Sequence, residues 1–173
     1  KMLHDWRKEV DAQMPRLKTA TSSTQLKKQP SVNMNLPADV NKFAPGWKVR
    51  DWGGPSMKPG LRNDWMGRKN VLLTHPLSRD VPCVLSRKLE VPTGKKTTLE
   101  FDVTNHPKGN WKLVVRINGK NVVTQSIEYT KWKAFQIDLT NHAGKTVTIE
   151  LENRATGWAF EAAYWSRLEV VSE

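Results

Sequence analysis

Four stretches between residues 98 and 152 alternate apolar and polar residues with a period of two. Such alternation gives a strand one buried and one wetter face, which is typical of antiparallel sheets rather than of helices. The apolar members of the four stretches are Leu99, Phe101 and Val103; Trp111, Leu113, Val115 and Ile117; Phe135, Ile137 and Leu139; and Val147, Ile149 and Leu151. The sequence therefore predicts antiparallel β structure for this part of the chain.

Turn signals and flanking segments extend this prediction. Asn118-Gly119 separates two of the stretches and is a strong signal for a two-residue hairpin. Segments 82–91 and 164–171 supply further strands, and no helix is predicted beyond residue 45. Many short strands with frequent turns favour two packed sheets. We therefore expect residues 43–173 to form an all-β, antiparallel sandwich or jelly roll.

The strand registers also predict which tryptophans are buried. Trp111 shares the inward register of its strand and is expected in the core. Trp165 is out of register with Leu168 and Val170, so we expect its ring on the opposite face of the sheet. Trp132 begins a strand, and its register leaves both faces open.

The first 42 residues follow a different pattern. Apolar residues at positions 3, 6, 10 and 14 fall on one face of a helix, and Pro15 ends it, so a short helix is predicted within residues 1–17. Residues 18–42 are rich in small polar residues and have no apolar periodicity, which predicts a linker. No signal peptide is recognisable, and because the chain begins with Lys1 we expect it to be a fragment of a longer protein.

The chain is strongly basic, with 28 Lys and Arg against 17 Asp and Glu and a net charge of +11. A field of this sign attracts polyanions such as nucleic acid or a sulfated glycan, although it is equally compatible with a solvated surface that has no such partner. No nucleic-acid motif is present, so a nucleic-acid partner is not expected. No apolar run approaches the roughly 18 residues needed to cross a bilayer, so no membrane insertion is expected either.

Two resemblances appear at this point. Segments 83–92, 111–119, 139–147 and 163–170 resemble galactose-binding-like β-sandwiches, the fold of many carbohydrate-binding modules and of accessory domains in bacterial polysaccharide-degrading enzymes. Residues 3–15 are similar to the C-terminal helix of bacterial arylsulfatase-like enzymes. Together they imply an accessory sandwich on a secreted sulfatase, with an extracellular or periplasmic location, a polysaccharide partner and a parent enzyme domain.

No catalytic site is expected in this chain itself. Cys83-Val84-Leu85-Ser86-Arg87 partly fits the sulfatase signature Cys-x-Pro-x-Arg, but Leu85 stands where Pro or Ala is usual and the alternation is that of an ordinary strand. The single cysteine also excludes an internal disulfide and a cysteine-based zinc site. Metal-ligating histidine pairs and nucleophile elbows are missing from the sequence. Paired carboxylates that meet only in space stay open.

Two segments that we expect to be loops interleave aromatic, charged and amide residues in a way that suits a binding site. The first spans residues 50–70 and the second residues 153–161. Their candidate ligand-binding residues are Trp52, Arg62, Asp64, Trp65, Arg68 and Trp158. The alternative is that Trp52 and Trp65 cap one end of the core. Domains of the resembled fold often hold a structural calcium, and Asp51, Asp64 and Glu161 are the candidate ligands here.

The leading hypothesis is therefore a non-catalytic carbohydrate-binding module. The positive charge favours an anionic, sulfated glycan, which Arg50, Arg62 and Arg68 would contact with bidentate guanidinium groups. The alternative is a structural or oligomerisation domain that packs on its parent enzyme without binding sugar.

Overall fold

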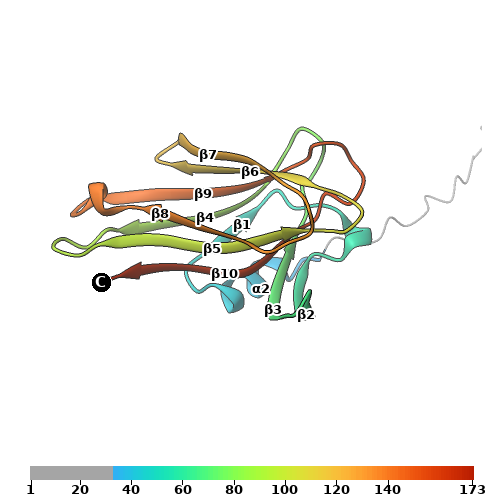
Figure 1. The fold of residues 1–173 in the computed structure, drawn as a ribbon, viewed down its shortest axis with the longest axis horizontal. Coiled ribbons are helices and arrows are strands. Elements are labelled where there is room, and N and C mark those ends of the chain that lie inside the picture. The colour runs from blue at the N-terminus through green and yellow to red at the C-terminus, as the bar shows by residue number, and fades with distance from the viewer. Residues whose placement is uncertain (1–32) are drawn as a thin grey trace, which may run out of the picture.

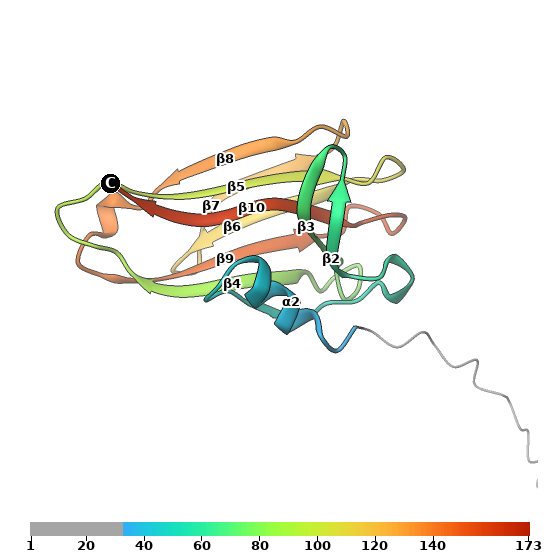
Figure 2. The ribbon, with the colours of Figure 1, turned by 90° about the horizontal axis from the view of Figure 1, so that it is seen from below.

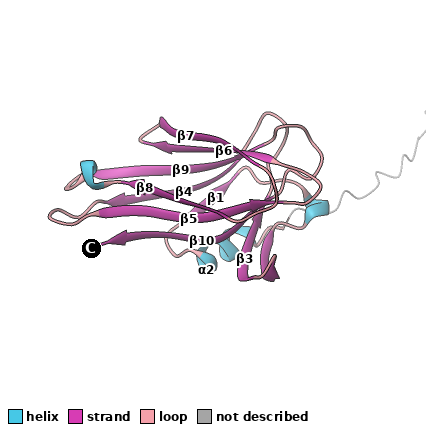
Figure 3. Ribbon diagram, in the orientation of Figure 1, coloured by secondary structure: helices cyan, strands magenta, loops and turns pink. Residues whose placement is uncertain are grey.

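A computed structural model describes residues 33–173 of the chain (Figure 1). The helix predicted within residues 1–17, and residues 18–32 of the predicted linker, lie outside this range. No helix in the described range is long and apolar enough to span a bilayer. Strands make up most of the described range, as the secondary-structure colouring of Figure 3 shows.

The described residues form two stacked five-stranded sheets in which every pairing is antiparallel. Sheet 1 has the order β1 (Lys48–Arg50), β4 (Cys83–Glu90), β9 (Thr146–Arg154), β6 (Trp111–Ile117), β7 (Lys120–Ile127). Sheet 2 has the order β2 (Gly60–Trp65), β3 (Arg68–Thr74), β10 (Ala163–Ser172), β5 (Thr97–Asn105), β8 (Lys133–Asp138). The connections between the strands include two short 3-10 turns, η1 (Pro55–Met57) and η2 (Thr140–His142). The predicted antiparallel β-sandwich is confirmed.

The core lies between the sheets and is built from the predicted inward positions. Trp111, Leu113 and Val115 from sheet 1 meet Leu99 and Phe101 from sheet 2, and all five are buried. The hairpin prediction is also confirmed. Asn118 and Gly119 join β6 to β7 with φ values of 51° and 77°, as a type I′ turn requires.

The prediction for Trp165 was wrong. A register shift between Trp165 and Arg167 in the β10–β5 pairing marks a β-bulge, and an extra residue reverses the face on which the following side chains lie. Trp165 and Leu168 therefore both point into the core, although an uninterrupted strand would place them on opposite faces. The Trp165 indole is fully buried and its Nε1 donates a hydrogen bond to Thr74 Oγ1 at 3.0 Å.

The predicted linker also ends too late. Helix α2 (Leu36–Phe43) occupies its last residues, beginning with Pro37 in the first turn, where the missing proline N–H costs nothing. Leu36 and Val40 are four residues apart, so they share one helix face, and both are fully buried in the core. Figure 2 shows α2 against the edge of the sandwich near β2 and β4. The folded unit thus begins before residue 43.

Four connections gather at one end of the sandwich, on the right in Figure 1 and opposite the C-terminus. They follow β3, β5, β7 and β9 and comprise residues 75–82, 106–110, 128–132 and 155–162. Pairing in register brings their ends together, since Ala163 lies opposite both Thr74 and Asn105. We call residues 106–110, 128–132 and 155–162 the end loops.

Candidate functional site

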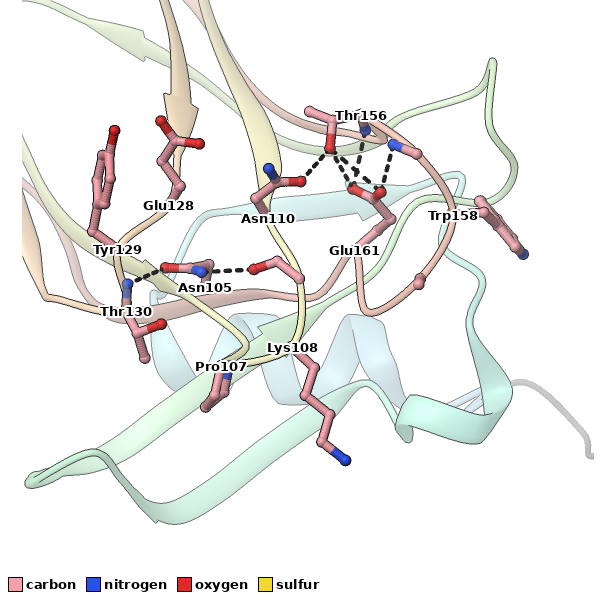
Figure 4. Close-up of a pocket in the computed structure, with 13 residues that line it drawn as sticks. Asn105, Pro107, Lys108, Asn110, Glu128, Tyr129, Thr130, Thr156, Trp158 and Glu161 are labelled. Atoms are coloured by element: carbon pink, nitrogen blue, oxygen red, sulfur yellow. Dashed lines mark hydrogen bonds between the residues drawn. The ribbon is translucent and has the colours of Figure 1, made fainter.

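The end loops surround a hollow of about 690 Å³. Polar and aromatic side chains line most of it, and those that matter below are Asn105, Asn110, Glu128, Tyr129, Thr156 and Trp158. Figure 4 shows Glu128 and Tyr129 on one side and the two asparagines near the middle, whereas Trp158 lies on the other side with its indole turned away from these side chains. A concave site with a few placed polar groups and aromatic residues at its rim is a common form of small-ligand site.

Asn105, at the end of β5, fixes two of the end loops. Its buried Nδ2 donates hydrogen bonds to the carbonyls of His106 at 3.1 Å and Gly109 at 2.6 Å. Its Oδ1 accepts one from the Thr130 backbone N–H at 2.9 Å (Figure 4). One carboxamide therefore holds residues 106–110 against residues 128–132, and it is itself positioned by the sheet.

Glu161 fixes the third end loop in a similar way. Its side chain is only 1% exposed, and its carboxylate accepts hydrogen bonds from the backbone N–H groups of Thr156 at 3.0 Å and Gly157 at 2.6 Å. The Thr156 hydroxyl in turn bonds to Asn110 Oδ1, which links this loop to residues 106–110. A buried carboxylate satisfied by backbone donors makes a rigid anchor.

Gly109 allows the loops to approach closely. A methyl group at this position would lie 2.3 Å from the Phe160 carbonyl oxygen and 2.6 Å from that of Ala159, which is closer than such atoms can come. Phe160 itself has a φ of 54°, and its ring stacks on His106 with centroids 4.5 Å apart. The backbones of the two loops are therefore interlocked, and only glycine fits between them.

Two aromatic side chains remain exposed at the hollow. Tyr129 is 81% exposed and Trp158 is 40% exposed. Tyr129 and Thr130 both have positive φ values, 76° and 51°, which are unfavourable for residues other than glycine. Such backbone strain persists only where the surroundings impose it, and here the Asn105 hydrogen bond to Thr130 does so. The neighbouring Glu128 raises the pKa of the Tyr129 hydroxyl, through a side-chain hydrogen bond and through its negative charge.

Among the residues predicted to bind ligand, only Trp158 lines the hollow. Trp52 packs against the core and donates its Nε1 hydrogen bond to the Asn33 carbonyl. Trp65 stacks on Tyr164 with ring centroids 4.2 Å apart. Asp64 is exposed on β2, opposite Lys69 in the strand pairing. Trp52 thus borders the core, as the alternative expected, whereas Trp65 packs against a separate cluster formed by Val71, Leu73, Ala162 and Tyr164.

The arginines of that segment are bound to acceptors of the chain itself. Arg62 donates to the carbonyls of Met57 at 3.0 Å and Lys58 at 2.5 Å. Arg68 pairs with Asp102 at 2.6 Å and donates to Ser166 at 2.8 Å.

Segment 60–74 is also not a loop, because it forms the β2–β3 hairpin. The sequence hides this hairpin because β2 is an edge strand with the consecutive polar residues Arg62, Asn63 and Asp64 at its centre, which interrupt the alternation.

Sequence reasoning missed Asn105, Asn110, Glu128 and Tyr129. One signal was available, since Asn105 ends a strand and precedes a His-Pro turn, where a carboxamide commonly bonds to nearby backbone. The backbone N–H of Thr130, next to Tyr129, donates a hydrogen bond to Asn105, which is 25 positions away in sequence, and no local pattern encodes this contact.

The candidate calcium ligands do not form a visible cluster. Asp51 is exposed and lies 3.7 Å from Arg50, whereas Glu161 is occupied by the backbone donors described above. Within residues 33–173, no group of three or more His, Cys, Asp or Glu side chains is placed to hold a metal. Calcium binding stays a prediction from the resemblance.

Cys83 has the environment of a structural residue. It lies at the start of β4, fully enclosed, and burial raises the pKa of its thiol to about 12. A nucleophilic cysteine needs the thiolate form and access to substrate, and Cys83 has neither at neutral pH. The partial sulfatase signature at this position therefore has no catalytic counterpart in the structure.

His75, beside the hollow, gives the fold a predicted pH dependence. Burial lowers the pKa of His75, whereas the Pro76 carbonyl and the negative charge of Glu161 act in the opposite direction and raise it. The imidazole ring contacts the Trp158 ring edge-on, with centroids 5.5 Å apart. Because the unfolded chain then binds a proton at higher pH than the folded chain, the free energy of unfolding should fall as the pH drops below about 6.5. In thermal melts, the melting temperature should fall less between pH 7 and pH 5 for His75→Gln than for the wild type. An equal fall in melting temperature for both proteins would mean that His75 is not the source of the pH dependence.

Comparison with known proteins gives structural similarities only. No family model and no curated protein matches the chain. A CBM22-1 xylan-binding domain from Paenibacillus barcinonensis Xyn10C has 17% identity over 75% of this chain and 86% of its own, with a TM-score of 0.49. A family 35 carbohydrate-binding module from Clostridium thermocellum has 15% identity over 73% and 92%, with a TM-score of 0.47.

A secreted serine protease, VesC from Vibrio cholerae, has 16% identity over 78% of this chain and 27% of its own, with a TM-score of 0.49. Similarities this low do not assign a ligand to this chain.

Proposed function

We propose that this chain is a non-catalytic carbohydrate-binding module and that its sugar site is the hollow between the end loops. The observation that carries the proposal is a polar hollow between rigidly held loops, with the exposed Tyr129 on one side and Trp158 at the rim on the other, its indole turned outward (Figure 4). Aromatic side chains exposed at a concave, rigidly held site are available to a ligand rather than to the core.

The chemistry of the hollow suits a sugar. A pyranose ring has an apolar face, which an aromatic ring can cover, and a rim of hydroxyl groups that both donate and accept hydrogen bonds. Asn110 uses its Oδ1 for Thr156, which leaves its Nδ2 group to donate to a ligand. Glu128 offers a carboxylate acceptor on the opposite side. Because Asn105 and Glu161 hold the loops before ligand arrives, little ordering is needed on binding.

We extend the proposal to the nature of the glycan and its context. The net charge of +11 supports an anionic, sulfated polysaccharide as the partner. The similarity of residues 3–15 to the end of arylsulfatase-like enzymes supports attachment to a polysaccharide-degrading parent enzyme outside the cytoplasm. In that arrangement the module would keep the enzyme close to its polymer.

Affinity electrophoresis in gels containing xylan, galactan or carrageenan tests the sugar site. The wild-type chain should be retarded by at least one of these polymers, and Tyr129→Ala or Trp158→Ala should weaken the interaction by about tenfold. Val122→Ala removes another exposed apolar side chain, on β7, and serves as the matched control. Absence of retardation for the wild type would favour the structural-domain alternative, whereas equal retardation for all variants would mean that the polymer binds outside the hollow.

A further inference from the structure

The outward face of sheet 1 is strongly basic. Because Leu85, Leu151 and Val115 point into the core, alternation places the neighbouring residues of their strands on the opposite side. Basic residues of this outward register are Lys48, Arg50, Lys88, Lys112, Arg116 and Arg154. The acidic residues of the same register are Glu90, Glu150 and Glu152.

Two of these three acids are already neutralised by the arginines. Glu152, itself buried, lies 3.0 Å from Arg116 and is also paired with Arg154. Glu150 accepts a hydrogen bond from Arg50 at 2.6 Å. Each carboxylate can cancel only one positive charge, so the face keeps a positive excess.

The three lysines outnumber Glu90, the one acid of this register that is not paired with an arginine. Lys48, Lys88 and Lys112 are exposed, and within residues 33–173 none of them has an acidic partner at ion-pair distance. They stand on β1, β4 and β6. Strands β1 and β4 are neighbours, β9 lies between β4 and β6, and β1 is three strand spacings of about 4.8 Å each from β6. Lys88 pairs with Thr148 of β9 and Lys112 with Arg154, so the two lysines are six positions, or about 20 Å, apart along the strand direction. A linear polyanion must therefore run obliquely over the sheet to contact both.

The outward face of sheet 2 has the opposite character. Its long strands β5, β8 and β10 carry Glu100, Asp102, Asp138 and Glu169 in the outward register. Arg167 pairs with Glu100 and Asp102, and Arg68 reaches Asp102 from β3. Positive charge is thus concentrated on one side of the sandwich, which a generally basic surface would not require.

We infer that the outward face of sheet 1 binds the sulfate groups of an anionic polysaccharide, while the end loops bind its sugar rings. The inference rests on the proposed carbohydrate function and separates the recognition of charge from that of the ring. Ammonium and guanidinium groups donate charge-assisted hydrogen bonds to sulfate oxygens. Hydroxyl groups of Thr124, Ser126 and Thr148 lie in the same register and suit sugar hydroxyls.

A sulfated glycan fits this face better than a nucleic acid does. Single-stranded nucleic acid is held by base stacking on exposed aromatic side chains. The outward register of sheet 1 contains no aromatic residue among the described strands, since Trp111 points inward. Double-stranded DNA stays as an outcome of the test, because phosphate contacts alone attract it.

The test compares dextran sulfate with uncharged dextran as probes for the 173-residue chain. Lys48→Gln/Lys88→Gln/Lys112→Gln should weaken dextran sulfate binding by about tenfold, measured by isothermal titration calorimetry at fixed salt. The matched control, Lys69→Gln/Lys95→Gln/Lys131→Gln, removes the same charge from exposed positions outside sheet 1 and should weaken binding by about threefold or less.

Three results would overturn the inference. Equal weakening by both triple variants would mean that net charge alone attracts the polymer. No binding of dextran sulfate by the wild type would remove the anionic partner. Binding of double-stranded DNA at least as tight as that of dextran sulfate would assign the face to nucleic acid. Failure of the proposed sugar site is distinguishable, because Trp158→Ala would then leave retardation in xylan, galactan and carrageenan gels unchanged while the sheet 1 effect persisted.

Discussion

The Trp165→Ala variant is expected to unfold with a free energy about 3–5 kcal/mol lower than that of the wild-type chain. The Trp165 ring is fully buried between Phe101 and Trp111, with centroid distances of 6.0 Å and 5.6 Å. Its removal leaves a cavity in the centre of the sandwich, and the hydrogen bond that Trp165 Nε1 donates to Thr74 Oγ1 is lost. Urea-induced unfolding followed by circular dichroism measures the loss.

Trp158→Ala is the control for this prediction. It removes the same type of side chain from an exposed position, so its free energy of unfolding should change by about 1 kcal/mol or less. If Trp165→Ala lowered the free energy of unfolding as little as Trp158→Ala is expected to, Trp165 would not be part of the core. The face assigned to Trp165 by the bulge in β10 would then be wrong.

The Glu161→Ala variant should lose both stability and sugar binding. The substitution leaves the backbone N–H groups of Thr156 and Gly157 without their acceptor, which costs about 2–3 kcal/mol. Residues 155–162 should then move, carrying Trp158 away from the hollow and weakening glycan retention by about tenfold or more. Unfolding curves and affinity electrophoresis measure the two effects separately.

Glu161→Gln and Glu128→Gln complete this series. The glutamine at position 161 keeps one carbonyl acceptor and should recover part of the stability. Glu128→Gln alters an acid that lines the hollow without such backbone bonds, so its stability should match the wild type. If Glu161→Ala binds glycan as tightly as the wild type, the end loops do not form the site.

The sandwich was predictable because its signals are local. Period-two alternation around Phe101, Val115 and Ile149, together with the Asn118-Gly119 turn, defined strands and a hairpin without knowledge of tertiary contacts. The errors arose where tertiary structure overrides the local pattern. A bulge after Trp165 reversed its face, and burial of Leu36 and Val40 stabilised a helix inside a polar segment.

The site was predictable only in part, for a physical reason. An aromatic-rich segment looks the same in sequence whether its rings face a ligand or other side chains. In the structure Trp65 stacks on Tyr164, whereas Trp158 is exposed. The hollow is assembled from end loops that are at least 18 residues apart in sequence, and Asn105 and Glu161 fix them through backbone groups. Only pairing in register reveals that these loops meet.

The central claim is that the end loops bind sugar, and an NMR titration of the 15N-labelled chain tests it most directly. Oligosaccharides of xylan, galactan and carrageenan would be added in turn while backbone amide, asparagine side-chain and tryptophan indole signals are followed. We expect a binding oligosaccharide to shift the signals of residues 105–110, 128–130 and 156–161, including the Trp158 indole. Shifts concentrated instead at Trp52, Arg62 and Trp65, or no shift with any of the three, would contradict it.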